Sequence, residues 1–143
     1  MVGHDIENDQ RLMAFFAHAS IVVFGPGVLV GLIIWLTQKG KAAFASRQGM
    51  QAALYQLVGM IITAGLWVVW SVFYALTWIP LIQNPAQFEA APPPIFWVGL
   101  ASMAIPLLVM LLWGVYGLWG GIQVLRGKEF RYVWIGRVIA PEE

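Results

Sequence analysis

The stretch AALYQLVGMIITAGLWVVWSVFYALTWIPLI, from Ala52 to Ile82, decides the fold because no Lys, Arg, Asp or Glu interrupts it. A helix needs about 20 consecutive apolar residues to cross a hydrocarbon core of roughly 30 Å, and this stretch is long enough. Two other stretches share the property, Leu12 to Leu36 and Ile95 to Leu125. Helices of soluble proteins seldom pass about 20 residues. The sequence therefore predicts an all-α fold, a polytopic bundle of membrane helices built from three long apolar segments.

The composition agrees with a membrane protein. Sixty per cent of the residues are apolar and 10% are charged, whereas soluble domains have roughly a quarter of their residues charged. Too few polar side chains remain to cover a globule, so we expect the lipid bilayer to be a partner. The net charge of +1 argues against a nucleic-acid partner, since such proteins concentrate basic residues on one face. The chain has no cysteine, which excludes disulfides and thiolate sites.

The first apolar segment contains Gly25-Pro26-Gly27 at its middle, and two interpretations stay open. Gly and Pro are turn residues, so the triplet would be the tip of a helical hairpin that enters and leaves on one side. Alternatively, the segment is a single kinked span, because Pro is tolerated in membrane helices. The hairpin would leave every Lys and Arg of the chain on the same side of the membrane, and we favour it for that reason.

Charge divides the chain into an acidic N-terminal tail (1–11), a transmembrane domain (12–125) and a basic C-terminal tail (126–143). Lys and Arg of short loops stay on the cytoplasmic side of a membrane. We therefore expect a multi-pass protein of the bacterial inner (cytoplasmic) membrane with a cytoplasmic C-terminus. The proline-rich loop from Gln83 to Pro94 would face outward. The predicted cytoplasmic basic residues are Lys39, Lys41, Arg47, Arg126, Lys128, Arg131 and Arg137.

His18 is the one residue within the apolar segments that titrates near neutral pH. No second histidine or carboxylate shares its depth, so the sequence predicts no catalytic site, no metal site and no enzyme activity. One interpretation is a neutral imidazole bonded to a backbone carbonyl or to a polar neighbour such as Gln56 or Ser20. The alternative is cofactor binding, with His18 as the axial ligand of a chlorin pigment, because Ala14 precedes it by four residues as in the Ala-x-x-x-His of light-harvesting polypeptides.

Glycine spacing indicates where helices pack. Gly-x-x-x-Gly places small residues on one helix face and lets two backbones approach closely. One such pair lies in the first segment and another in the third, where a further glycine precedes it by one turn. The predicted helix-packing residues are Gly27, Gly31, Gly114, Gly117 and Gly121.

Four short motifs resemble a known family. They are RLMAFFAHAS (11–20), LIIWL (32–36) followed by Lys39, QAALYQ (51–56), and GKEFRY (127–132) followed by Ile135-Gly136-Arg137. Together they are similar to small bacterial membrane proteins related to the Tic component, about twenty kilodaltons in size, of the chloroplast inner-envelope translocon. The resemblance implies an all-helical membrane domain with a split first segment. The family's usual Pro directly before the Ile-Ile-Trp-Leu run is absent, because Gly31-Leu32 stands there.

Two functions follow as expectations. The first is a non-catalytic structural or accessory subunit that packs its glycine faces against helices of other membrane protein subunits in a larger complex. The second is a protein translocation or insertion component, which the resemblance to the plastid machinery implies. The glycine spacing and the lack of charged residues inside the apolar segments favour the first.

Overall fold

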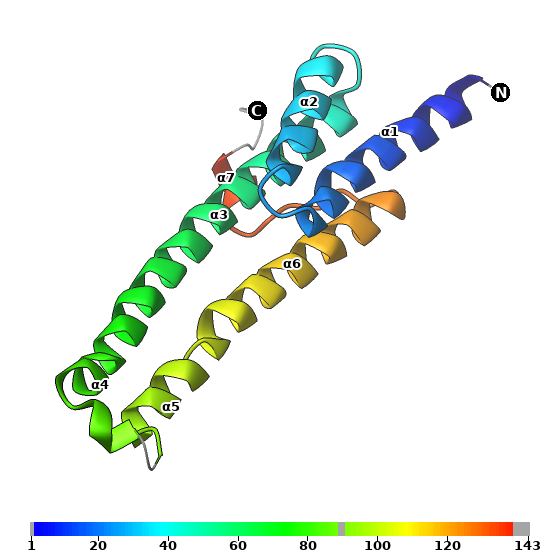
Figure 1. Cartoon of the computed structure of the whole chain (residues 1–143). Helices are drawn as coiled ribbons and strands as arrows, with labels where there is room; N and C mark the ends of the chain where they lie inside the picture. Colours follow the sequence, from blue (N-terminus) through cyan, green and yellow to red (C-terminus); the bar gives the residue numbers. More distant parts are fainter. Residues whose placement is uncertain (1, 89–90, 139–143) are drawn as a thin grey trace. The chain divides into compact units, whose positions relative to one another are not determined.

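A computed structural model describes residues 2–88 and 91–138, and all regular secondary structure in these ranges is helical (Figure 1). The chain forms two compact units. Unit 1 comprises Met1–Met60 and Trp113–Glu143, and unit 2 comprises Ile61–Leu112. The all-α prediction is confirmed for the described residues.

The first apolar segment folds as a helical hairpin in unit 1. Helix α1 (Val2–Ala19) continues into a short 3-10 turn, η1 (Ser20–Val22), and the chain then reverses into α2 (Gly27–Gln38). Gly25 has φ +85°, a left-handed conformation that glycine adopts at little cost. Helices α1 and α2 pack against each other (Figure 1). The hairpin interpretation is therefore confirmed over the single kinked span.

Within the described ranges, two apolar helical segments, not three, are long enough to cross a membrane: Ala43–Gln83 and Pro94–Leu125. The prediction of three long segments is wrong at the first one, because the turn at Gly25 divides it. Helix α2 has 12 residues and extends about 18 Å at 1.5 Å per residue, well short of a hydrocarbon core of roughly 30 Å. Only 11% of the most apolar window of each long segment is buried, so most of its apolar surface is available to lipid.

Unit 2 holds the connection between the two long segments. Helix α3 (Ala43–Thr77) is followed by α4 (Ile79–Gln83), by a 3-10 turn η2 (Pro85–Phe88) and by α5 (Pro94–Ala101). The third apolar segment breaks between α5 and α6 (Ala104–Leu125), which the sequence did not predict. Pro106 explains the break, because its ring removes a backbone donor and excludes the carbonyl four residues earlier. Within this unit the Trp70 indole donates a hydrogen bond to the Gly99 carbonyl (3.2 Å).

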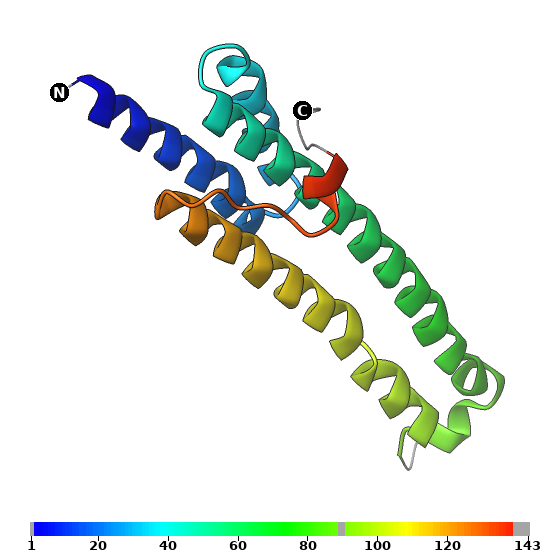
Figure 2. The ribbon, with the colours of Figure 1, turned by 180° about the vertical axis from the view of Figure 1, so that it is seen from behind.

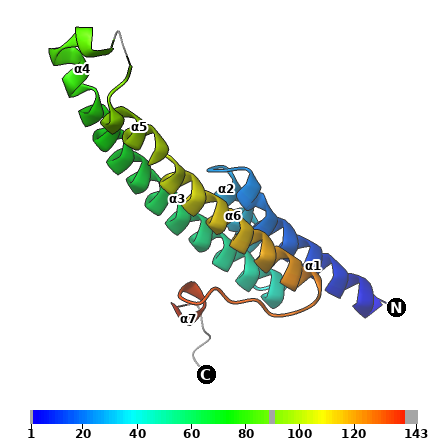
Figure 3. The same ribbon diagram turned by 90° about the horizontal axis from the view of Figure 1, so that it is seen from below.

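The described part of the basic C-terminal tail, residues 126–138, returns along unit 1 and is called the strap below. Gly127, with φ +77°, reverses the chain after α6. Figures 2 and 3 show the strap leaving the end of α6, running beside α3 and ending in the short helix α7 (Ile135–Val138). Its Tyr132 joins Ile21 and Tyr55 in the buried cluster of this unit. Residues 139–143 of the predicted tail lie outside the described residues.

Candidate functional site

His18 lies in the last turn of α1, with its side chain completely buried. Ala14 and Ala17 are also fully buried, and their small side chains leave room for the imidazole on that face of the helix. The ring nitrogen Nδ1 lies 2.8 Å from the Tyr132 hydroxyl, and Nε2 lies 3.0 Å from Oε1 of Gln48. The polar neighbours of His18 are therefore Gln48 and Tyr132 rather than Gln56 or Ser20.

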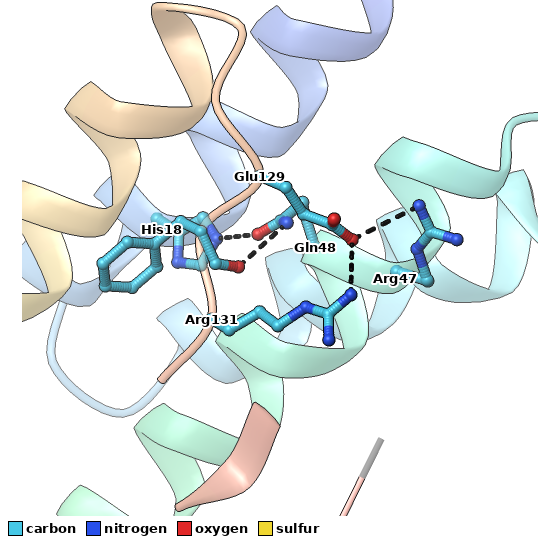
Figure 4. Close-up of polar contacts among 6 residues, drawn as sticks. His18, Arg47, Gln48, Glu129 and Arg131 are labelled. Atoms are coloured by element: carbon cyan, nitrogen blue, oxygen red, sulfur yellow. Dashed lines mark hydrogen bonds and ion pairs between the residues drawn. The ribbon is translucent and has the colours of Figure 1, made fainter. Parts of the chain in front are cut away.

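The arrangement of donors decides the tautomer of His18. Nε2 of Gln48 donates to the carbonyl of Phe130 (3.0 Å), so the amide oxygen of Gln48 faces the imidazole as an acceptor (Figure 4). His18 must then carry its proton on Nε2 and accept a hydrogen bond from the Tyr132 hydroxyl on Nδ1. Both ring nitrogens are used in this arrangement. Neither is left for a chlorin metal unless the network opens.

Burial keeps both ends of this network uncharged. It lowers the pKa of His18 to about 4, an effect that the hydrogen bond with Gln48 opposes in part. It also raises the pKa of Tyr132, and Tyr55 and Tyr116 add to the rise. Removal from water disfavours the charged form of each group. Both side chains therefore stay neutral at physiological pH, as a buried hydrogen-bonded pair requires.

An ion-pair cluster lies beside this network at the surface. Oε1 of Glu129 lies 3.5 Å from the guanidinium of Arg47 and 3.3 Å from that of Arg131. Figure 4 shows both arginines pointing toward Glu129, one from α3 and one from the strap. The side chains are 42–50% exposed, so each pair is worth at most about 1 kcal/mol. The cluster joins the strap to α3 but contributes little to stability.

Aromatic stacking holds the middle of unit 1 together. The Tyr55 ring stacks on Tyr132 with centroids 3.8 Å apart and on Trp113 at 4.7 Å. Tyr55 and Trp113 also exchange hydrogen bonds: the tyrosine hydroxyl donates to the Trp113 carbonyl (2.8 Å), and the indole donates to the Tyr55 carbonyl (3.3 Å). Tyr132 is only 2% exposed. It is thus a core residue of unit 1.

Gln56 closes the turn of the hairpin. Its Nε2 donates to the Ala17 carbonyl (2.9 Å) and to the Ser20 hydroxyl (3.1 Å). The Ser20 hydroxyl lies within donor distance of two carbonyls, those of Ala17 and Gly27. The hairpin is therefore fastened to α3 by side-chain hydrogen bonds that satisfy the backbone carbonyls at its turn, a need that becomes acute where water is excluded.

The predicted packing glycines have different environments. A Cβ on Gly27 would meet the Ser20 carbonyl and the Gln56 amide, and one on Gly31 would lie 2.9 Å from the Ala53 nitrogen and the Gly49 oxygen. Gly31 therefore marks a close crossing of α2 over α3. In the first segment, Gly27 therefore serves the turn and Gly31 serves helix packing.

The predicted packing glycines of the third segment also differ in their surroundings. A Cβ on Gly117 would lie 2.7 Å from the side chain of Ile21, and one on Gly121 would lie 3.3 Å from the ring of Phe15. Nothing lies within 4 Å of such an atom on Gly114, so no described group of this chain packs there. Sequence reasoning missed Gly49, whose Cβ would lie 2.9 Å from the Trp35 nitrogen. No Gly-x-x-x-Gly spacing marks that position.

The predicted basic residues all belong to unit 1, where Arg47 and Arg131 share Glu129. Across residues 2–88 and 91–138, no group of three His, Asp or Glu side chains could hold a metal ion. The site that the sequence predicted around His18 is thus a buried polar network that joins α1, α3 and the strap. What it can do in this arrangement is hold these three segments together.

Comparison with protein-family models matches residues 9–139 to the magnetosome magnetite crystal formation protein family, MamF/MmsF. No curated protein and no solved structure matches the chain. The family match agrees with a small membrane protein, but it provides no link to the Tic component that the four motifs resemble.

Proposed function

The chain belongs to the magnetosome magnetite crystal formation protein family, and from that membership we propose that it is a non-catalytic subunit of the magnetosome membrane that supports crystal formation by packing against other membrane proteins. The observation that carries the proposal is the closed network at His18. The one side chain in the apolar segments that titrates near neutral pH has both ring nitrogens bonded within the chain. Its role is then to hold the fold and not to perform chemistry.

The surface of the chain supports a packing role. The faces of α3 and α6 expose large apolar residues, among them Ile61, Val69 and Leu112 at 65%, 68% and 66%. Lipid and neighbouring helices both suit such faces. On α6, no described group of this chain lies within 4 Å of a Cβ added to Gly114, so a partner helix would approach closely there.

Deletion and complementation in a magnetosome-forming bacterium test the proposal. We expect the deletion strain to make crystals of altered size or number in electron micrographs, and the parent gene to restore them. His18→Gln should restore them less well, in proportion to lost folded protein. Unchanged crystals in the deletion strain would refute the link to crystal formation.

Extraction in mild detergent followed by native gels tests the packing part. A complex of fixed stoichiometry with other magnetosome membrane proteins is the expected result. Recovery of the chain alone would contradict a subunit role. Recovery with secretory clients or translocon partners would instead favour a translocation component, a function that rests on the motif resemblance alone.

A further inference from the structure

The strap carries the most exposed large apolar side chain of the described residues. Trp134 is 84% exposed and Val133 is 61% exposed, whereas Tyr132, next to them, is 2% exposed. Exposing the large apolar surface of a tryptophan to water is unfavourable compared with burying it. Trp134 is exposed although the chain is held at Tyr132, two residues earlier, and this exposure calls for an environment that covers it.

The strap packs against α6 through the residues that precede Val133 and Trp134. The Phe130 ring packs where a Cβ on Gly120 would be, and Tyr132 contacts Tyr116 with centroids 5.6 Å apart. Gly120 and Tyr116 lie five and nine residues before Leu125, where α6 ends. At 1.5 Å per residue, the strap has therefore returned about 8 Å and then about 14 Å along α6. Phe130 and Tyr132 thus lie against α6, and Trp134 follows two residues after Tyr132.

Cationic side chains flank the exposed pair. Arg131 is 50% exposed, and Arg137 is exposed in the last turn of α7. Tryptophan prefers the level of the lipid headgroups. Long basic side chains near it reach out to the headgroups and favour anionic lipids.

We propose that Val133 and Trp134 anchor the strap in the membrane–water interface, with Arg137 against anionic lipid headgroups. The basic tail is then not a free extension. The network at His18 fixes Tyr132, and this in turn presents Trp134 to the bilayer. The anchor lies in unit 1 and requires no partner protein.

The absence of cysteine from the chain allows a direct test. Trp134→Cys, labelled with an environment-sensitive NBD dye, is compared with Lys128→Cys, an exposed position at the start of the same strap. The full-length protein is reconstituted into vesicles of phosphatidylcholine, with and without an equimolar amount of phosphatidylglycerol. We expect the dye at 134 to emit at shorter wavelength and to be quenched several-fold less by iodide than the dye at 128. Lipids spin-labelled near the headgroup should quench it more than lipids labelled at the chain end.

Three outcomes would overturn the proposal. Equal iodide quenching at both positions would place Trp134 in water. Stronger quenching from the chain end would place it in the hydrocarbon core. A dye that is shielded in native membranes but exposed in vesicles of purified protein would assign the surface to a protein partner. The role of Arg137 is tested with the anionic lipid. Phosphatidylglycerol should increase the blue shift of the dye at position 134, and Arg137→Gln should abolish that increase. If the increase is the same in the Arg137→Gln variant, Arg137 is not part of the anchor.

Discussion

Gly31→Ala provides a sharp test of the packing between the hairpin and α3. The added Cβ would lie 2.9 Å from the Ala53 nitrogen and the Gly49 oxygen, and 3.1 Å from Cα of Ala53. Carbon atoms at optimal separation lie about 3.5–4.0 Å from their neighbours. All the atoms named belong to helix backbone, so no side chain can rotate aside. Helices α2 and α3 must separate instead.

The expected cost follows from two opposing effects. Inserting a methyl group into a packed crossing typically costs about 1–3 kcal/mol. Alanine returns up to about 1 kcal/mol, because glycine is a weaker helix former. We therefore expect Gly31→Ala to lower the free energy of unfolding by up to about 2 kcal/mol after this correction.

Gly114→Ala is the matched control, since it is the same change in a helix of the same unit. An added Cβ there meets no described group of the chain within 4 Å, so only the helix-propensity gain of up to about 1 kcal/mol remains. The measurement is reversible unfolding in mixed mild and denaturing detergent, followed by circular dichroism. The two variants should change stability in opposite directions. If Gly31→Ala is as stable as Gly114→Ala, the close crossing of α2 and α3 does not exist as described.

Three further predictions concern the buried network, the third segment and the topology. The pKa of His18 is lowered from 6.5 to about 4 by burial, so the unfolded chain binds more protons between these values. Above pH 6.5, His18 should add no pH dependence to the free energy of unfolding, and from pH 6.5 toward pH 4 this free energy should fall. A His18→Gln variant should lack this part of the pH dependence. If the variant and the parent have identical pH profiles, His18 is not buried as a neutral side chain. Gly117→Ile should weaken folding by at least about 1–3 kcal/mol, since its Cβ would already lie 2.7 Å from Ile21; thermal stability in detergent equal to the parent would show that the contact is absent. A cysteine at Ala90, which lies outside the described residues, should react with an impermeant maleimide from outside, and one at Ala42 should not; labelling at Ala42 would reverse the orientation.

The sequence by itself determined the class of this protein. Runs without charge, such as Ala52 to Ile82, cannot be covered with water-soluble side chains, and their backbone must be paired internally in lipid, which leaves helices. The sequence favoured a turn at Gly25-Pro26-Gly27 over a kinked span, because Gly tolerates left-handed backbone and Pro lacks a backbone donor, and the structure decided between the two. Gly31 and Gly117 were predicted to pack for the same kind of reason: a missing side chain permits close approach whatever the partner is.

Only the tertiary structure decided which groups meet. The partners of His18 are Gln48 and Tyr132, which lie 30 and 114 positions away along the chain, and no local pattern encodes contacts over such separations. The same folding back of the strap turned Tyr132 into a core residue and left Trp134 exposed, although the two are separated by one residue. Hydrophobicity is a property of each side chain, but burial depends on the neighbours that the whole fold brings to it.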